Sequence, residues 1–529
     1  MSEQLEKLKE QLMEIDNLRS AAALLYWDQA TYMPPGGATA RGQQIATLNH
    51  ISHEKFTSDR MGELLEDLAW YELESPYDSD ETNLVRITRL KYEKAIKVPS
   101  DFMAKISNHS AASYQAWTKA RPANDFSTML PYLEKTLELS RQLADFYPGY
   151  EHIANPLIDR SDEGMKAEQI RLIFSELRSK LVPMVNAITN QIATDVSCLH
   201  GDFPEQDQFQ FGNMVIKQLG FDFNRGRQDK THHPFMTKFS INDVRITTRS
   251  KDDDISESLF STIHEAGHAF YELGINENFN ATPLGSGTSS GIHESQSRLW
   301  ENIVGRSREF WEFFYPKLQS AFPGQFDSVP IDQFYKAINN VERSLIRTDA
   351  DEVTYNLHVM MRFDLELDLL VGQLAIKDLP QAWNERFRSD FGIVPTDDSN
   401  GVLQDVHWYS GTIGGAFQGY TLGNILSRQF YDRATQTHSE ISTEIANGKF
   451  DTLQNWLREQ IYRHGSKFTP NELIRRVTGN ELSIEPYIRY LWGSMVNFIS
   501  YRFCLLWTDG EDFQVLMLDK FSLCLPISG

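Results

Sequence analysis

Two histidines, His264 and His268, flank Glu265 in an H-E-x-x-H motif. On a helix this spacing turns both imidazoles to the same side, which suits two ligands of one divalent metal ion. Zn²⁺ accepts two histidines and a glutamate and keeps one coordination position open for water. Glu265 would stand beside that water as a general base. These residue types at this spacing therefore indicate hydrolysis of a peptide bond at a metal centre.

The third ligand has to come from another part of the chain. Metzincins place a glycine and a third histidine at fixed distances after the motif, but Tyr271 and Gly274 occupy those positions. The gluzincin pattern instead takes a glutamate from a later helix, and the segment IHESQ supplies Glu294. We therefore predict that Glu294 joins the two histidines as a metal ligand. The alternative is a surface glutamate near two solvent-facing histidines on an ordinary helix.

The surroundings of the motif predict a buried helix. Apolar residues recur at helical spacing from Ile255 to Phe270. Asp254 is expected to cap the helix, with Glu257 completing a capping box, and Gly274 is a plausible end. The following stretch LGSGTSSG, residues 284–291, is either a simple connector or a wall that offers backbone groups to an extended substrate.

Most of the remaining chain has helical periodicity as well, over residues 5–25, 101–143 and 167–192. The sequence MPPGG at residues 33–37 predicts a turn. One short region differs, because Val244, Ile246 and Thr248 alternate with polar residues. This alternation predicts a small sheet at about residues 233–249, with a hairpin through residues 241–243.

Composition narrows the function further. The 529 residues include 51 Lys and Arg against 73 Asp and Glu, a net charge of −22. An acidic chain disfavours binding to nucleic acid or to anionic membranes, both of which require basic surface. Three cysteines give no disulfide framework, and the charged N-terminal residues 1–9 lack the apolar core of a secretory signal. Both features predict a cytoplasmic protein.

Five motifs in order resemble the M32 metallocarboxypeptidase family (carboxypeptidase Taq, thermostable carboxypeptidase). The resemblance runs from about Leu24 to about Tyr490 and includes Y-W-D at residues 26–28 followed by M-P-P. The motifs are H-E-x-x-H at residues 264–268, H-E-S-Q at 293–296, D-x-R-x-T at 243–247, I-R-x-x-A-D at 346–351 and G-x-x-Q-D-x-H-W at 401–408.

The resemblance implies a mainly helical fold related to neurolysin and angiotensin-converting enzyme, with a groove between two helical halves and a small sheet near the metal. We expect one peptidase domain over residues 1–490, with N-terminal helices (1–80) above the cleft and catalytic helices at about 250–430. It also implies Zn²⁺, or in some members Co²⁺, a homodimer, and removal of C-terminal residues from peptides with a free C-terminus and broad specificity.

Several other residues are candidates for the site. Arg347 is predicted to bind the terminal carboxylate of the substrate, and the alternative is an ion pair with Asp349 or Asp351. His407 and Tyr420 are predicted to stabilise the oxyanion, although a buried histidine next to a tryptophan is as often a core residue.

Gln404 and His233 are further candidates for contact with the substrate. Asp243 and Arg245 are either an ion pair that holds the sheet or substrate contacts. Asp351 and Glu352 are candidates to orient a ligand imidazole, and the sequence does not decide between a structural and a functional role for these four.

The resemblance fades after Tyr490. Residues 491–507 are mostly apolar, with Arg502 as the only charge, and residues 513–525 are apolar again. A membrane span is disfavoured by the length and by the charge, so we expect a packed or partner-binding tail. Two rival functions remain at this point: an endo-acting oligopeptidase, and a non-catalytic peptide- or partner-binding protein. The presence of Glu265 argues against the second, because a structural metal site needs no base.

Overall fold

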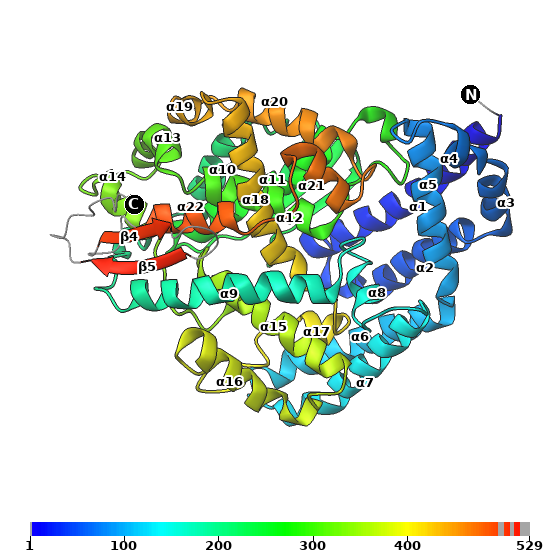
Figure 1. Cartoon of the computed structure of the whole chain (residues 1–529), viewed down its shortest axis with the longest axis horizontal. Coiled ribbons are helices and arrows are strands. Elements are labelled where there is room, and N and C mark those ends of the chain that lie inside the picture. The colour runs from blue at the N-terminus through cyan, green and yellow to red at the C-terminus, as the bar shows by residue number, and fades with distance from the viewer. Residues whose placement is uncertain (1–2, 496–501, 508–512, 519–529) are drawn as a thin grey trace.

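The computed structural model describes residues 3–495, 502–507 and 513–518. Within them the chain is almost wholly helical, with one three-stranded sheet and one two-stranded ribbon (Figure 1). The predicted mainly helical fold is confirmed. The apolar faces of the helices gather in two hydrophobic clusters, which divide the molecule into two halves.

The first cluster is built by the N-terminal helices and by the helices that carry the metal motifs. These are α1 (Glu3–Thr31), α2 (Ala38–Phe56), α3 (Asp59–Asp67), α4 (Trp70–Glu74), α5 (Asp80–Lys97), α10 (Glu205–Leu219), α11 (Ile255–Gly274), α12 (Ser290–Arg298), α13 (Arg308–Ala321), α14 (Ile331–Ile338), α19 (Ile441–Ala446), α20 (Asp451–Gln460) and α21 (Pro470–Thr478).

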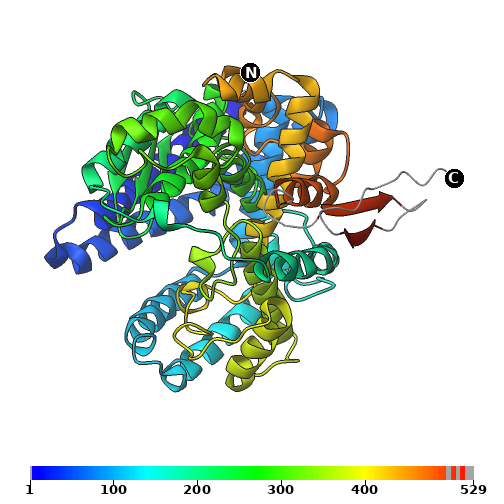
Figure 2. The ribbon, with the colours of Figure 1, turned by 90° about the vertical axis from the view of Figure 1, so that its left-hand side faces the viewer.

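The second cluster draws on two separate stretches of chain and on the last helix. Its helices are α6 (Ser100–Ala120), α7 (Phe126–Asp145), α8 (Asn155–Ile158), α9 (Ala167–Thr189), α15 (Thr354–Leu370), α16 (Leu379–Phe391), α17 (His407–Ser410) and α22 (Glu485–Met495). Figure 2 shows most of the cyan and yellow segments of this cluster together at the bottom, below the green, orange and blue segments of the first.

Helix α18 (Gln418–Thr437) belongs to both clusters. Leu422 and Ile425, in its N-terminal half, pack in the second cluster, whereas Leu426 and Phe430 pack in the first. The helix therefore forms the common wall of the two halves, and residues near its beginning lie at the junction between them.

The sheet begins earlier in the chain than predicted. Strand β3 (Asp243–Thr248) pairs antiparallel with β2 (Met236–Ser240), as the hairpin prediction requires, and pairs parallel with an additional strand, β1 (Gly226–Lys230). The sequence of β1 is GRQDK, which has no alternation of apolar residues and so gave no strand signal. On the buried face of β3, Val244 and Ile246 pack in the first cluster, and the strand contacts α11.

The start of α11 differs in one detail from the prediction. Asp254 caps the helix by accepting a hydrogen bond from the backbone N–H of Ser256 at 2.8 Å. Glu257 does not complete a capping box, because it pairs with Arg249 and with Lys251 at 2.9 Å. The two cations draw its carboxylate to the end of β3, so this glutamate joins the sheet to the helix.

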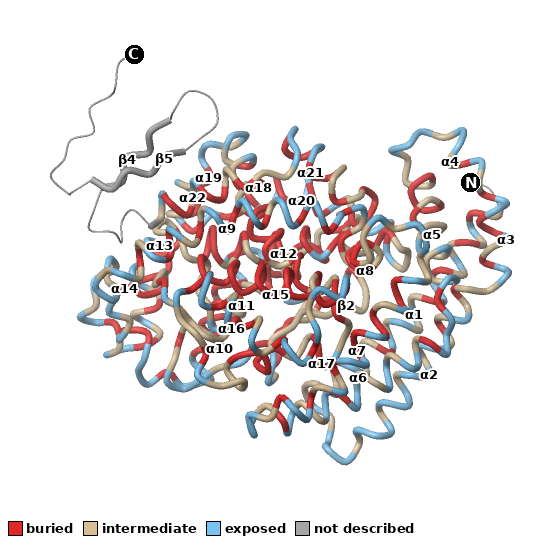
Figure 3. The backbone as a smooth tube through the Cα atoms, turned by 60° about the horizontal axis from the view of Figure 1, so that its bottom comes forward, coloured by how far each residue is buried: buried red, intermediate tan, exposed pale blue. Residues whose placement is uncertain are grey.

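Helices α11 and α12 approach each other closely at Gly267. A Cβ atom on this glycine would lie 2.6 Å from the Cα of Ser297 and 2.7 Å from the backbone oxygen of Gln296. Both helices are largely buried at the centre of the molecule (Figure 3). Gly267 therefore permits the distance at which side chains from the two helices meet.

The C-terminal tail does not continue as one helix. Helix α22 ends at Met495, and β4 (Arg502–Trp507) pairs antiparallel with β5 (Phe513–Leu518). None of the helices in the described ranges is long and apolar enough to cross a bilayer. The other residues of the predicted apolar tail lie outside the described part of the chain.

We predict that Gly267→Ala destabilises the protein. The added methyl group meets backbone atoms of α12, which cannot move aside independently, so a loss of about 1–3 kcal/mol is expected. The measurement is the free energy of unfolding from denaturant titration. Gly42→Ala in α2 is the control, because no atom lies within 4 Å of its Cβ position. A gain of about 0.4–1 kcal/mol is expected there. Equal stability of the two variants would contradict the close approach.

Candidate metal centre and catalytic cleft

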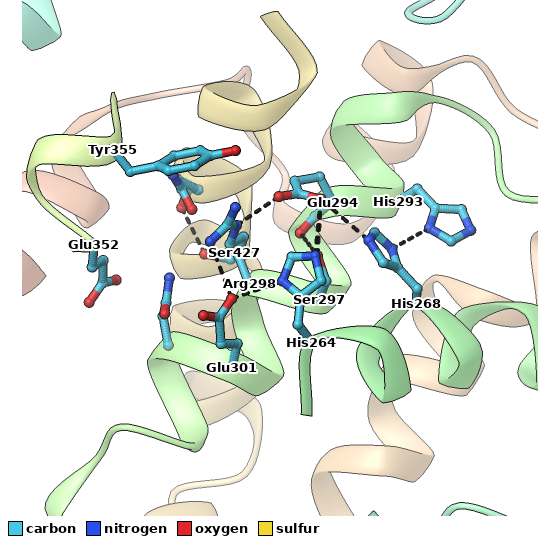
Figure 4. Close-up of polar contacts among 12 residues, drawn as sticks. His264, His268, His293, Glu294, Ser297, Arg298, Glu301, Glu352, Tyr355 and Ser427 are labelled. Carbon is cyan, nitrogen blue, oxygen red and sulfur yellow. Dashed lines mark hydrogen bonds and ion pairs between the residues drawn. The ribbon is translucent and has the colours of Figure 1, made fainter. Parts of the chain in front are cut away.

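The three predicted ligands converge in the structure. His264 and His268 lie one turn apart on α11, and Glu294 faces them from α12 (Figure 4). The Oε2 atom of Glu294 is 3.8 Å from Nε2 of His264 and 3.4 Å from Nε2 of His268. Ligand atoms about 2.1 Å from a tetrahedral zinc ion stand about 3.4 Å apart, so this donor set fits a divalent ion.

A carboxylate fixes the tautomer of His264. Its Nδ1 atom lies 2.8 Å from Oε2 of Glu301. Because a carboxylate only accepts hydrogen bonds, Nδ1 carries the proton and Nε2 presents its lone pair toward Glu294. Glu301 belongs to a π-helical segment, Leu299–Val304, that continues α12. This wider turn sets the position of Glu301 relative to Glu294, and such segments recur at functional sites.

His268 is oriented through a second histidine. Its Nδ1 atom lies 2.6 Å from Nδ1 of His293, and Nε2 of His293 lies 2.9 Å from Oε1 of Glu272. The carboxylate of Glu272 requires a proton on Nε2 of His293, so Nδ1 of His293 accepts the proton of His268. Nε2 of His268 is then left with a free lone pair. Lys238 from β2 pairs with Glu272 and completes the chain.

Opposite charges stabilise the buried carboxylates. Arg298 donates to Glu294 at 2.7 Å and to Glu301 at 3.2 Å, and its guanidinium lies between them (Figure 4). Burial opposes ionisation of Glu301, but Arg298 and His264 outweigh it and hold the pKa at about 2. Burial likewise opposes ionisation of Glu272, and Lys238 holds its pKa at about 2. The acceptors that orient both imidazoles are therefore charged at neutral pH.

Glu265 differs from its neighbours in its titration. The side chain is 7% exposed, and burial raises its pKa to about 7, although the nearby His264 opposes the shift. A carboxyl group with a pKa near the working pH is well suited to accept a proton and later to return it.

A cleft of about 870 Å³ opens beside this cluster. Its floor includes His268, Glu294 and Tyr420, and residues 286–290 of the glycine- and serine-rich stretch form one wall. Side chains of α2, α5 and α6 line it as well, together with residues 159–161 and 163 of the segment after α8. The glycine-rich stretch therefore does more than connect two helices, since it borders the space in which a substrate would lie.

Tyr420 is joined to a second polar network. Its hydroxyl lies 3.0 Å from Nε2 of His407, and Nδ1 of His407 contacts the carboxylate of Asp405. Arg347 and Arg362 donate to the same carboxylate at 2.6 and 3.1 Å. The arrangement leads from two buried arginines through an aspartate and a histidine to a phenol at the cleft, and it holds the phenol in place.

The carboxylate partner of Arg347 is Asp405, not Asp349 or Asp351. The guanidinium also donates to the hydroxyl of Tyr355 at 2.9 Å, and the side chain is 9% exposed. Gln404 supports it, because the amide oxygen accepts from the backbone N–H of Arg347 at 2.9 Å.

The family of the chain follows from comparison with known proteins. The model of the Carboxypeptidase Taq (M32) metallopeptidase family matches residues 7–495. The chain belongs to this family. It is thus a metal-dependent carboxypeptidase, a peptide hydrolase, as its motifs indicated. The match ends near the point where the resemblance of the sequence fades.

Relatives of this carboxypeptidase share nearly its whole length. Thermostable carboxypeptidase 1 from Thermus thermophilus is 38% identical over 484 residues, which cover 90% of this chain and 94% of the relative. Carboxypeptidase 1 from Bacillus subtilis is 35% identical, with 91% and 95% covered. The crystal structure of an M32 carboxypeptidase from Deinococcus radiodurans R1 has a TM-score of 0.91 at 46% identity and covers 94% of this chain and 100% of that one.

Two residues predicted to contact the substrate, Gln404 and His233, have protein partners in the structure. All four hydrogen-bonding positions of the Gln404 amide are taken by protein groups: its oxygen accepts from Arg347 and Arg362, and its nitrogen donates to the backbone oxygens of Leu345 and Asn400. Contact with a substrate would require one of these bonds to break. His233 is exposed between β1 and β2, and its ring contacts the backbone oxygen of Pro234.

The structure gives protein partners to the four residues whose roles were left open, Asp243, Arg245, Asp351 and Glu352. Asp243 and Arg245 form a two-fold ion pair on β3, with both distances at 2.9 Å, which favours a role in the sheet. Asp351 accepts from the backbone N–H groups of Val353 and Thr354 at the start of α15. Glu352 accepts from the hydroxyl of Tyr490 at 3.0 Å. The Nδ1 atoms of His264 and His268 contact Glu301 and His293 instead, and no hydrogen bond within the described residues joins either ring to Asp351 or Glu352.

Sequence reasoning did not assign the residues that orient the ligands. His293 lies inside the H-E-S-Q motif on α12, and Glu272 follows His268 by one turn on α11. Their places on these helix faces could have indicated an orienting role. Glu301 is seven residues after Glu294, two turns along the same face. A search for acidic residues at helical spacing from the ligands could have found it.

We predict that His293→Phe weakens metal binding by about 10–100-fold, because the proton of His268 Nδ1 loses its acceptor. The variant keeps an aromatic ring at this position, so the fold should be preserved. The measurement is the metal dissociation constant from competition with a chelator. His109→Phe in α6 is the control, since its hydrogen bonds go to Tyr132 and Thr136 of α7. An unchanged dissociation constant in His293→Phe would rule out the relay.

Proposed function

We propose that His264, His268 and Glu294 hold one Zn²⁺ ion and that Glu265 is the general base for removal of C-terminal residues from peptides. The proposal rests on the convergence of two imidazole Nε2 atoms and one carboxylate oxygen, all within 4.8 Å of one another, beside a cleft that His268 and Glu294 line. Both imidazoles have tautomers that leave these nitrogens as acceptors. Co²⁺ would fit the same nitrogen and oxygen donors.

An ion held by His264, His268 and Glu294 would supply Lewis-acid chemistry: it would polarise the scissile carbonyl and favour ionisation of water. Glu265 takes the proton from the attacking water and delivers it to the leaving amine, for which its pKa of about 7 is suited. Tyr420 would turn its single O–H from Nε2 of His407 toward the oxyanion that develops on the substrate. His407 acts through this contact and through its link to Asp405.

The substrate of this proposed reaction is a peptide with a free C-terminus. Arg347 remains our candidate for binding the terminal carboxylate of the substrate, because it lies next to Tyr420. Its guanidinium carbon is 5.3 Å from the centre of the Tyr420 ring. Arg160 is a second cation to compare with it. It is exposed on the cleft wall, and no ion pair joins it to another described residue. We propose that Gln404 positions Arg347 and that His233 lies at the rim of the cleft.

Further parts of the proposal rest on composition and on the family resemblance. They are broad side-chain specificity, a single catalytic unit over residues 1–490, a homodimer in the cytoplasm, and no nucleic-acid or membrane partner. The acidic net charge of −22 supports the last of these. Sedimentation equilibrium tests the dimer, for which the mass should be twice 60.9 kDa.

We predict that Glu265→Gln retains one equivalent of metal and loses turnover by about 10²–10⁴-fold, because the variant lacks a base but keeps the ligands. Metal content is measured by elemental analysis, and turnover is measured with a short unblocked peptide. Glu312→Gln on the exposed side of α13 is the control and should match the wild type. Wild-type activity in Glu265→Gln would reject the assignment.

The same assay separates the rival functions. An endo-acting oligopeptidase would cut peptides that are blocked at both ends, whereas a carboxypeptidase would leave them intact. A non-catalytic binding protein would bind metal without turnover of either peptide. Only release of single C-terminal residues from the unblocked peptide agrees with the proposal.

We predict that Arg347→Met lowers kcat/KM about 10–100-fold more for a peptide with a free C-terminus than for its amidated form, since a charge-assisted contact contributes about 1.5–3 kcal/mol. Arg160→Gln is made in parallel and should change both peptides by less than about threefold. If Arg347→Met lowers kcat/KM equally for both peptides, the role of this arginine is only to pair with Asp405. A selective loss in Arg160→Gln would assign the carboxylate contact to the cleft wall.

A further inference from the structure

The segment between α8 and α9 contains a buried carboxylate that the reaction does not use. Asp162 is 1% exposed, and its neighbours Ser161 and Glu163 line the cleft. Oδ1 accepts from the backbone N–H of Gly291 at 2.7 Å, and Oδ2 accepts from the amide of Gln418 at 2.8 Å. Gly291 lies in the first turn of α12 and Gln418 begins α18. One side chain thus joins the beginnings of two helices.

Helices α12 and α18 run parallel at very short distance. A Cβ on Gly419 would lie 2.2 Å from Oγ of Ser290, and a Cβ on Gly423 would lie 2.5 Å from Cγ of Glu294. Ser290 therefore faces Gly419, and Glu294, four residues further along α12, faces Gly423, four residues further along α18. The two helices run in the same direction. Both N-termini point to the same place, and Asp162 lies there.

This arrangement creates an electrostatic problem that Asp162 relieves. Each helix N-terminus carries a partial positive charge, and two of them side by side repel each other. A carboxylate between them is attracted to both, and it gives the backbone N–H of Gly291 an acceptor in the buried first turn of α12. Ser161 adds to the junction, since its backbone oxygen accepts from the N–H of Ser290 at 2.8 Å and its hydroxyl donates to Asp162 at 3.2 Å.

The two helices carry different parts of the site. Glu294 is in α12, one turn after the contact with Gly291, and Tyr420 is in the first turn of α18, two residues after Gln418. Both line the same cleft as the segment that contains Asp162. The spacing between the third metal ligand and the phenol is therefore set where the two helices begin.

We propose that Asp162 is a positioning residue for catalysis, which fixes α12 against α18 and so fixes Glu294 relative to Tyr420. This inference rests on the proposed roles of those two residues. It predicts that loss of the Asp162 charge disturbs the chemical step more than the binding of substrate, because the groups that bind the remote parts of a peptide stay in place. A displacement of about 1 Å at a reacting centre costs about 10²-fold in rate.

The test uses Asp162→Asn, which keeps the volume and one acceptor, and Asp162→Ala, which removes both charge and acceptors. We expect kcat to fall about 10-fold in Asp162→Asn and about 100-fold in Asp162→Ala, with KM within about threefold of the wild type. The visible absorption spectrum of the Co²⁺-loaded protein is the second readout, and it should shift in both variants as Glu294 moves. Glu151→Gln, at a glutamate that is 80% exposed ahead of α8, is the control for loss of an acidic charge.

Two outcomes would overturn the inference. One is a lowered unfolding temperature with unchanged kcat and an unchanged Co²⁺ spectrum at 25 °C, which describes a purely structural residue. The other is a rise in KM at constant kcat. If Asp162→Ala does not yield folded protein, Asp162→Asn decides the question alone. Wild-type metal binding and turnover are measured first, so a failure of the proposed function is recognised separately, before any variant is compared.

Discussion

The site depends on two imidazole nitrogens that must both face one point with free lone pairs. A neutral imidazole has two tautomers, and nothing in an H-E-x-x-H motif by itself selects between them. The selection comes from Glu301, which accepts the Nδ1 proton of His264, and from Glu272, which acts on His268 through His293. Because both carboxylates are buried, each needs a cation beside it. Arg298 pairs with Glu301, and Lys238 pairs with Glu272. The helix α12, its π-helical extension and strand β2 are thus all tied to the orientation of two rings.

The second network follows the same logic on the other side of the cleft. Asp405 is buried and accepts from two arginines, and it in turn orients His407, which holds Tyr420. In both networks a buried acid is kept charged by guanidinium or ammonium groups and acts on the cleft through a histidine. Such chains are costly to bury unless every member has a partner. They account for two charged residues buried inside helices, Glu294 in α12 and Arg362 in α15.

The sequence predicted the fold class and named the three candidate ligands that the structure brings together, because the signals for both are local. H-E-x-x-H, a later glutamate and apolar helical periodicity are each visible within a short window. The orienting residues were less accessible, since the link from Glu272 to His268 passes through His293 on another helix, and the link from Arg347 goes to Asp405, 58 residues away. Strand β1 was missed because its residues are polar and its pairing with β3 is formed by the tertiary structure. The close contact at Gly267 likewise depends on a partner helix that the local sequence does not reveal.

The position of α18 in both hydrophobic clusters has a mechanical consequence. His264, His268 and Glu294 come from helices whose apolar residues belong to the first cluster, whereas Asp405 and His407 adjoin residues of the second. A rigid rotation of one half about this shared helix would widen or narrow the cleft without pulling the ligand atoms apart. Peptide entry and product exit would then cost little metal affinity, and cofactor retention and substrate traffic could evolve under separate constraints.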